Sequence, residues 1–163
     1  NELADGKIGG YTDYKGELLS IYEAAMRYKE EQIDTIVLAG KDYGMGSSRD
    51  WAAKGANLLG VKVVLAESFE RIHRSNLVMM GILPLQYLEG EDADNLGLTG
   101  KETFDIDLPQ NPQVGQLVDV IARKGDEEIA FEARLRFDAE ADIRYYENGG
   151  ILPMVVRKKL EEV

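Results

Sequence analysis

Two serines and an arginine lie next to one another at a position where they could bind an anion. Residues 41–54 read Lys-Asp-Tyr-Gly-Met-Gly-Ser-Ser-Arg-Asp-Trp-Ala-Ala-Lys, so Ser47, Ser48 and Arg49 follow two closely spaced glycines. Glycine permits positive φ and a close backbone approach, and serine favours the N-cap of a helix. Free N–H groups and the positive end of the helix dipole would then face the same point as the hydroxyls and the guanidinium. A carboxylate or a phosphate would fit there.

The segments on either side of this motif predict a strand, a loop and a helix. Residues 35–39, Thr-Ile-Val-Leu-Ala, form a short apolar run rich in β-branched residues, which is typical of a buried strand. A helix is expected to run through Trp51, Ala52, Ala53 and Leu58, with Ser47 or Ser48 as its N-cap. Neither the P-loop spacing nor G-x-G-x-x-G is present, and a glycine-rich loop of this kind can also simply begin a helix.

The rest of the chain predicts an α/β fold with three layers. Apolar periodicity favours further helices over residues 17–29, 69–80 and 154–162, and strands over residues 61–66, 84–87, 103–106, 116–122 and 129–137. Helices alternate with strands of parallel type in the first half, and strands dominate the second half. This order is typical of α/β proteins rather than of all-α or all-β proteins.

Composition limits the kinds of function that this chain can carry. Its 163 residues suit one compact domain, and no apolar run approaches the ~20 residues of a membrane span. The absence of cysteine excludes disulfides and thiolate metal sites. The net charge of −11 and the lack of an obvious basic stripe argue against nucleic-acid binding. The chain also lacks a signal peptide and opens on Asn1 without a methionine, so we expect a soluble piece of a longer protein.

The order Gly-Ser-Ser-Arg-Asp resembles the signature of the aconitase superfamily, in its C-terminal swivel domain (domain 4). Within that superfamily, the sequence is most similar to the aconitase A and iron-regulatory-protein branch. Further segments of the chain follow that branch in the same order: residues 21–29, 58–77, 80–85, 96–100 and 145–152. The resemblance implies a three-layer β/β/α swivelling domain, as in isopropylmalate isomerase small subunits. It also implies that residues 1–163 form one such domain.

The resemblance further implies aconitate hydratase chemistry, in which citrate and isocitrate interconvert through cis-aconitate in the tricarboxylic acid cycle. By position in the motif, Ser47 is the catalytic base, and Ser48 and Arg49 bind a substrate carboxylate. The family's [4Fe-4S] cluster is held by cysteines outside this chain, in the remaining domains, and a further substrate arginine precedes Asn1. The chain alone is therefore expected to be inactive. A cytoplasmic location is implied, and RNA binding only by the full-length apo protein.

Three alternatives remain open at this point. The chain could belong to a 2-methylcitrate dehydratase, or be a small subunit of isopropylmalate isomerase or homoaconitase. Those small subunits usually begin with a strand and an Asp-Thr-Asp element, which residues 1–16 lack, and the wording Asp-Trp-Ala-Ala-Lys favours aconitase A. In the third alternative the chain is a non-enzymatic interaction module whose loop only caps a helix.

Five other residues are expected to be structural. His73, the only histidine, is predicted to be a hydrogen-bonded residue at the edge of an apolar helix stripe rather than a catalyst. Trp51 is expected to pack in the core or at a domain interface, and Asp50 to compensate the helix dipole. The Tyr145–Tyr146 pair is expected to pack the C-terminal segment.

Overall fold

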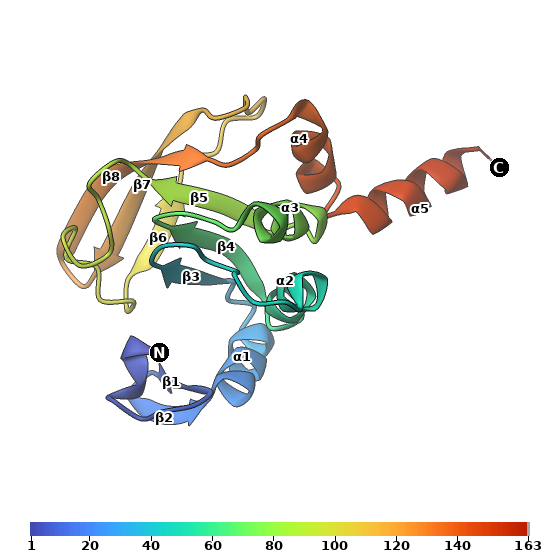
Figure 1. The fold of residues 1–163 in the computed structure, drawn as a ribbon. Helices are drawn as coiled ribbons and strands as arrows, with labels where there is room; N and C mark the ends of the chain where they lie inside the picture. Colours follow the sequence, from blue (N-terminus) through green and yellow to red (C-terminus); the bar gives the residue numbers. More distant parts are fainter. Residues whose placement is uncertain (163) are drawn as a thin grey trace.

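A curled six-stranded sheet forms the centre of the computed structural model, which describes residues 1–162 (Figure 1). The strands lie in the order β3-β4-β5-β8-β7-β6. One half of the sheet is parallel and contains β3 (Thr35–Ala39), β4 (Val61–Ala66) and β5 (Leu83–Tyr87). The other half is antiparallel and contains β6 (Thr103–Ile106), β7 (Leu117–Lys124) and β8 (Glu127–Leu135). The two halves join where β5 pairs with β8.

Two hydrophobic clusters divide the molecule into three layers. Helices α2 (Arg49–Leu58) and α3 (Arg71–Met79) connect the parallel strands and pack through Ala53 and Leu77 against Val64 and Ala66 of β4. Leu65 points to the opposite face, because successive strand residues alternate. There it joins the larger cluster, which contains residues of β7 and β8: Val118, Val120, Ala122, Phe131, Ala133 and Leu135. The expected α/β architecture with three layers is confirmed.

The N-terminal region contains a hairpin that the sequence analysis missed. A short 3-10 helix, η1 (Glu2–Ala4), precedes β1 (Tyr11–Tyr14), which pairs antiparallel with β2 (Glu17–Ser20). The predicted helix over residues 17–29 was therefore wrong in its first four positions, and α1 is Ile21–Glu30. The reason is a capping box at Ser20, whose hydroxyl accepts from the Glu23 N–H while the Glu23 carboxylate accepts from the Ser20 N–H.

The C-terminal region ends in two helices. The first, α4 (Glu140–Glu147), was not predicted, and Tyr146 on it packs 5.4 Å from the Phe137 ring, in line with the expected packing role. The second, α5 (Ile151–Glu161), begins before the predicted residue 154 because Pro153 falls in its first turn, where a missing N–H is tolerated. Figure 1 shows α5 projecting away from the body of the domain.

The other predicted elements lie within about two residues of the observed ones. Residues 35–39, 61–66 and 103–106 form β3, β4 and β6 as predicted. Helix α3 begins at Arg71 rather than at residue 69, because the Glu70 side chain caps it. Strands β5, β7 and β8 are shifted slightly from the predicted ranges.

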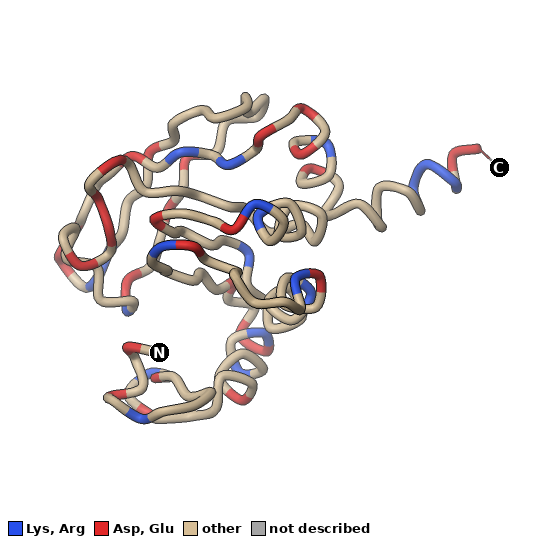
Figure 2. Tube along the Cα trace, viewed as in Figure 1, with Lys and Arg blue, Asp and Glu red and all other residues tan. Residues whose placement is uncertain are grey.

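Charged residues of both signs are mixed along the whole trace (Figure 2). The longest run of basic residues is Arg157–Lys159, near the end of α5. No helix within residues 1–162 combines the length and the apolar character needed to cross a membrane.

Candidate functional site

Ser47, Ser48 and Arg49 lie on the loop that leads from the carboxyl end of β3 into α2, as predicted. Ser48 occupies the N-cap position and its carbonyl accepts the Ala52 N–H at 2.9 Å, but its hydroxyl makes no capping hydrogen bond. Arg49 is the first residue of the helix. All three side chains are exposed and make no hydrogen bond or ion pair with residues 1–162. Their polar groups are therefore free to bind a ligand, together with the unpaired N–H groups of the first turn.

The first part of this loop is fixed to the segment that precedes α3. The Asp42 N–H donates to Ser68 Oγ at 2.7 Å, and the Tyr43 N–H donates to the Ser68 carbonyl at 2.9 Å. The Glu70 N–H in turn donates to the Tyr43 carbonyl at 2.9 Å. The Tyr43 ring also meets the Phe69 ring edge-on at 6.1 Å. Residues 42 and 43 thus have a firm attachment, in contrast to residues 45–49.

His73 lies beneath the loop and is only 2% exposed. Its structural character was predicted, but the expected hydrogen bonds are absent, because neither ring nitrogen has a partner within residues 1–162. Burial lowers the pKa of the ring, against smaller opposing effects of the Arg49 backbone and the Glu70 carboxylate. Burial thus favours the neutral form of the ring.

Trp51 does not pack in the core, which corrects one of the two roles expected for it. Its side chain is 69% exposed on α2, and Lys54 Nζ lies 5.0 Å from the ring centroid. Met45, on the same loop as the serines, is 72% exposed. The alternative role of Trp51, packing at a domain interface, remains a prediction. Asp50 lies in the first turn of α2, where its negative charge interacts favourably with the positive end of the helix dipole, as expected.

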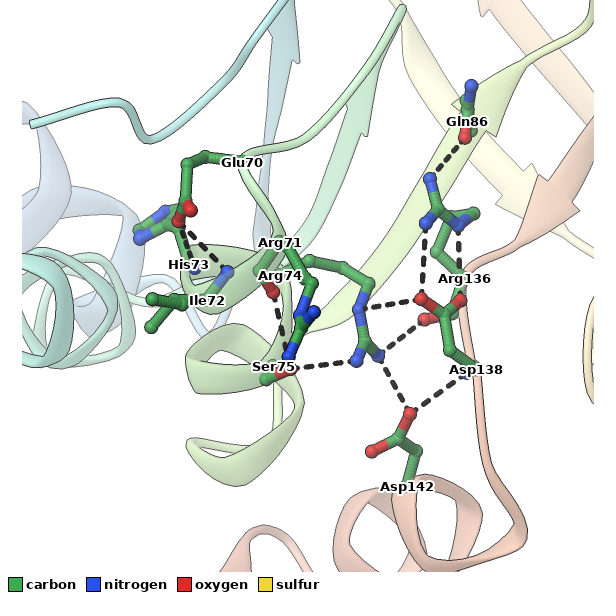
Figure 3. Close-up of polar contacts among 10 residues, drawn as sticks. All are labelled: Glu70, Arg71, Ile72, His73, Arg74, Ser75, Gln86, Arg136, Asp138 and Asp142. Atoms are coloured by element: carbon green, nitrogen blue, oxygen red, sulfur yellow. Dashed lines mark hydrogen bonds and ion pairs between the residues drawn. The ribbon is translucent and has the colours of Figure 1, made fainter.

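A buried arginine, which the sequence analysis did not single out, fixes α3 to the C-terminal half of the chain (Figure 3). Arg74 is 6% exposed, and its Nη1 donates to Asp142 Oδ2 at 2.7 Å and to the Arg136 carbonyl at 2.9 Å. Its Nε lies 3.2 Å from Asp138 Oδ2 without the alignment of a hydrogen bond. Asp142 also accepts the Asp138 N–H at 2.9 Å. Because Asp142 lies 68 positions from Arg74, no local pattern could have revealed the pair.

The motif lies on an open surface rather than in a pocket. A hollow of about 420 Å³ opens at the carboxyl ends of the parallel strands, but Ser47, Ser48 and Arg49 do not line it. Lys41, at the start of the motif loop, does, together with residues from the ends of β4 and β5: Glu67, Ser68, Gln86 and Tyr87. The three motif side chains thus face solvent in the part of the chain that the structure describes.

The chain cannot itself ligate an iron–sulfur cluster. Its sequence contains no cysteine, and residues 1–162 hold no group of three or more His, Asp or Glu side chains placed to bind a metal ion. Thiolates are the usual ligands of such clusters.

Comparison with known proteins identifies the class to which this arrangement belongs. Residues 1–90 match the model of the aconitase C-terminal domain family, and the chain belongs to that family. Similar proteins are named aconitate hydratase A, and an aconitate hydratase is a hydro-lyase. The chain is 73% identical to aconitate hydratase A of Streptococcus mutans, over 98% of its own length and 18% of the relative's. It is 58% identical to aconitate hydratase A of Bacillus subtilis, over 99% of its length and again 18% of the relative's.

The chain thus spans less than a fifth of the length of these relatives. Among solved structures, 3-isopropylmalate dehydratase of Methanocaldococcus jannaschii is similar with a TM-score of 0.47 and 19% sequence identity. That match covers 88% of this chain and 81% of the other. The likeness is too distant to bear on the activity of this chain.

Proposed function

We propose that residues 1–163 are one domain of a longer aconitate hydratase and supply its catalytic base and part of its substrate-binding groups. The observation that carries the proposal is the free state of Ser47, Ser48 and Arg49 at the start of α2. The identity to aconitate hydratase A supports the choice of citrate and isocitrate as substrates. The enzyme would act in the tricarboxylic acid cycle, in the cytoplasm.

Ser47 is proposed to exchange the proton at carbon when citrate or isocitrate interconverts with cis-aconitate. A serine alkoxide is normally too basic to form at neutral pH. The unpaired N–H groups of the first turn of α2 and the positive end of the helix dipole would stabilise it, most strongly once water is excluded. Because Ser47 is exposed in this chain, the proposal assigns the exclusion of water to the remaining domains.

Ser48 and Arg49 are proposed to bind one carboxylate of the tricarboxylate substrate. The planar guanidinium of Arg49 suits bidentate pairing with a carboxylate, and the Ser48 hydroxyl can donate one further hydrogen bond. This chain has no thiolate ligand for the [4Fe-4S] cluster of the family, so the proposal places the cluster in the remaining domains. RNA binding is proposed only for the full-length apo protein.

Substitution of Ser47 in the full-length protein tests the proposal. Ser47→Ala removes the base and keeps the carboxylate contacts, so kcat should fall by about 10³-fold or more with a much smaller change in KM. Ser20→Ala is the matched control, because it removes the hydroxyl that caps α1 at a cost of ~1 kcal/mol in stability and should leave kcat unchanged. Cluster content is checked by absorbance in each preparation.

Arg49→Lys should give a different kinetic result. Lysine keeps the charge but loses the planar fork, so KM should rise and kcat should also fall through misplacement of the reacting carbon.

If Ser47→Ala retained near-parental kcat with its cluster intact, the proton transfer would have to be assigned to another residue. Parallel assays with 2-methylcitrate and isopropylmalate decide between aconitate hydratase and the related hydro-lyases.

A further inference from the structure

The middle of the motif loop lies directly against the ring of His73. A Cβ atom at Gly44 would lie 2.2 Å from both Cγ and Cδ2 of His73, far inside van der Waals contact. Gly44 has a φ of +93°, a conformation that favours glycine. Both features allow the backbone at Gly44 to lie directly against the ring, which a residue with a side chain could not do.

The loop, the cap of α3 and the ring form one connected unit. Glu70 donates its backbone N–H to the Tyr43 carbonyl, and its carboxylate accepts from the N–H groups of Ile72 and His73 at 2.9 Å each (Figure 3). The Tyr43 ring meets the His73 ring edge-on, with 5.2 Å between the centroids. The position of the imidazole is thus set by the helix that carries it and by the residue that precedes Gly44.

The part of the loop that carries the chemistry has no comparable attachment. Met45 is 72% exposed, and Ser47, Ser48 and Arg49 are exposed and make no side-chain contacts of hydrogen-bond length with the described residues. The direction in which these residues leave the anchored segment is therefore set at Gly44, where the backbone meets the ring. A loss of the ring would leave a space under the loop and let this direction vary.

The ring nitrogens do not explain why His73 is there. Neither nitrogen has a hydrogen-bond partner within residues 1–162, and the Arg49 backbone acts on the ring without a hydrogen bond of normal geometry. Three residues act on the ring: Tyr43 packs its own ring against it, Glu70 acts through its carboxylate, and Arg49 acts through its backbone. Burial raises the pKa of the Tyr43 phenol and so keeps it neutral. Carbon atoms of the ring, rather than a hydrogen bond, make the contact with the loop at Gly44.

We propose that His73 is a positioning residue for the Ser47–Arg49 motif. Its ring supports Gly44 and so fixes the direction in which Ser47 and Arg49 are presented at the start of α2. The effect on turnover rests on the proposed function, because loop position matters for catalysis only if these residues act on the substrate. The effect on the loop itself does not depend on that function.

Two measurements on the full-length protein separate these effects. The first is hydrogen–deuterium exchange of peptides covering residues 42–50 without substrate, and the second is kcat and KM for citrate and isocitrate. His73→Ala should accelerate loop exchange by about tenfold or more and lower kcat by about 10- to 100-fold, the scale of a ~1 Å misplacement. His73→Phe keeps an aromatic face and should restore both values to within a few-fold of the parent.

Val78→Ala is the matched control, because Val78 is also fully buried on α3 but packs in the large cluster away from the loop. It should lower the thermal stability and leave loop exchange and kcat at parental values. If His73→Ala does not fold, Gly44→Ala tests the same contact from the loop side, since the added methyl must push the loop off the ring. Faster loop exchange is again the expected result.

Unchanged loop exchange in His73→Ala, or in a folded Gly44→Ala, would overturn the proposal. So would a His73→Phe variant as impaired as His73→Ala, together with recovery in His73→Gln, because hydrogen bonding would then carry the role. A parent protein without activity on citrate but with the expected exchange pattern would refute the proposed function and leave the positioning role intact. An active parent with an unaffected His73→Ala variant would refute the positioning role alone.

Discussion

At the scale of single residues, the most informative side chain is Arg49, because it lies beside two unused hydroxyls at the start of a helix. The lack of a carboxylate partner does not by itself distinguish it, since the exposed Arg71 and Arg144 also form no ion pair within residues 1–162. Arg49 makes no such pair within residues 1–162, and neither adjacent hydroxyl is used. This free set of donors at a helix N-terminus is suited to an anionic ligand.

Residue positions in the motif were predictable because their determinants are local. Two glycines and two serines ahead of a helix were sufficient to predict an N-cap at Ser47 or Ser48, and the structure has it at Ser48. The contact between Gly44 and His73 was not predictable from the sequence. Gly44 lies on the loop that follows β3 and His73 lies on α3, so the two residues meet only when the parallel strands and their helices have packed together. The sequence therefore indicated the groups that could act but not the side chain that supports them.

His73 should make the stability of the domain depend on pH in a definite direction. Its pKa is lowered in the folded state, while the unfolded value is about 6.5. The unfolded chain therefore binds more protons below that value, and the free energy of unfolding should fall as the pH drops from 7 to 5.5. The effect is measured by urea denaturation of the 163-residue chain across this range.

His73→Phe is the control for this pH dependence, since it removes the titrating group and keeps the ring. The carboxylates with lowered pKa values, such as Glu23 and Glu31, act at lower pH than this window. An equal slope in the parent and in His73→Phe would show that His73 does not contribute.

At the scale of elements, the short apolar strands were predicted well, whereas the strand at residues 17–20 and helix α4 were not predicted. β3 and β4 are short apolar runs between turn residues, so their limits follow from composition. Residues 17–20 form a strand because they pair with β1, although Leu18 also fits the helical period of α1. Helix α4 has no side-chain cap hydrogen bond of its own, and Asp142 on it is held by Arg74 from α3. Both cases depend on contacts distant in sequence.

The Arg74–Asp142 pair should be the main polar contact between α3 and α4. Asp142→Ala leaves the buried guanidinium without its principal partner, which typically costs about 3–5 kcal/mol in the free energy of unfolding. Asp138→Ala removes a carboxylate that is 42% exposed and should cost no more than about 1 kcal/mol. Urea denaturation of the two variants makes the comparison, and equal losses would contradict the assignment.

At the scale of the whole molecule, the residues of the proposed site lie on an open surface of this chain. The motif lies outside the hollow at the carboxyl ends of the strands, and Met45 and Trp51 beside it are exposed. Helix α5 also leaves apolar side chains in the open, including Leu152 and Leu160, each about 70% exposed. The aconitate hydratase A of Streptococcus mutans is more than five times as long as this chain, because the match covers only 18% of that relative. These features agree with a domain whose chemistry is completed by other parts of the same protein.

The 163-residue chain by itself should therefore not catalyse the interconversion of citrate and isocitrate. In the proposed division of roles it supplies a base and carboxylate-binding groups, and it has no thiolate for a cluster because it contains no cysteine. Purified chain should show no formation of cis-aconitate above a blank without protein, before or after anaerobic treatment with iron and sulfide. Circular dichroism and a cooperative thermal transition confirm that the sample is folded, and the full-length protein treated in the same way is the positive control. Activity of the folded chain alone would mean that the dehydration needs neither a cluster nor the remaining domains, and the division of roles proposed for Ser47, Ser48 and Arg49 would then be wrong.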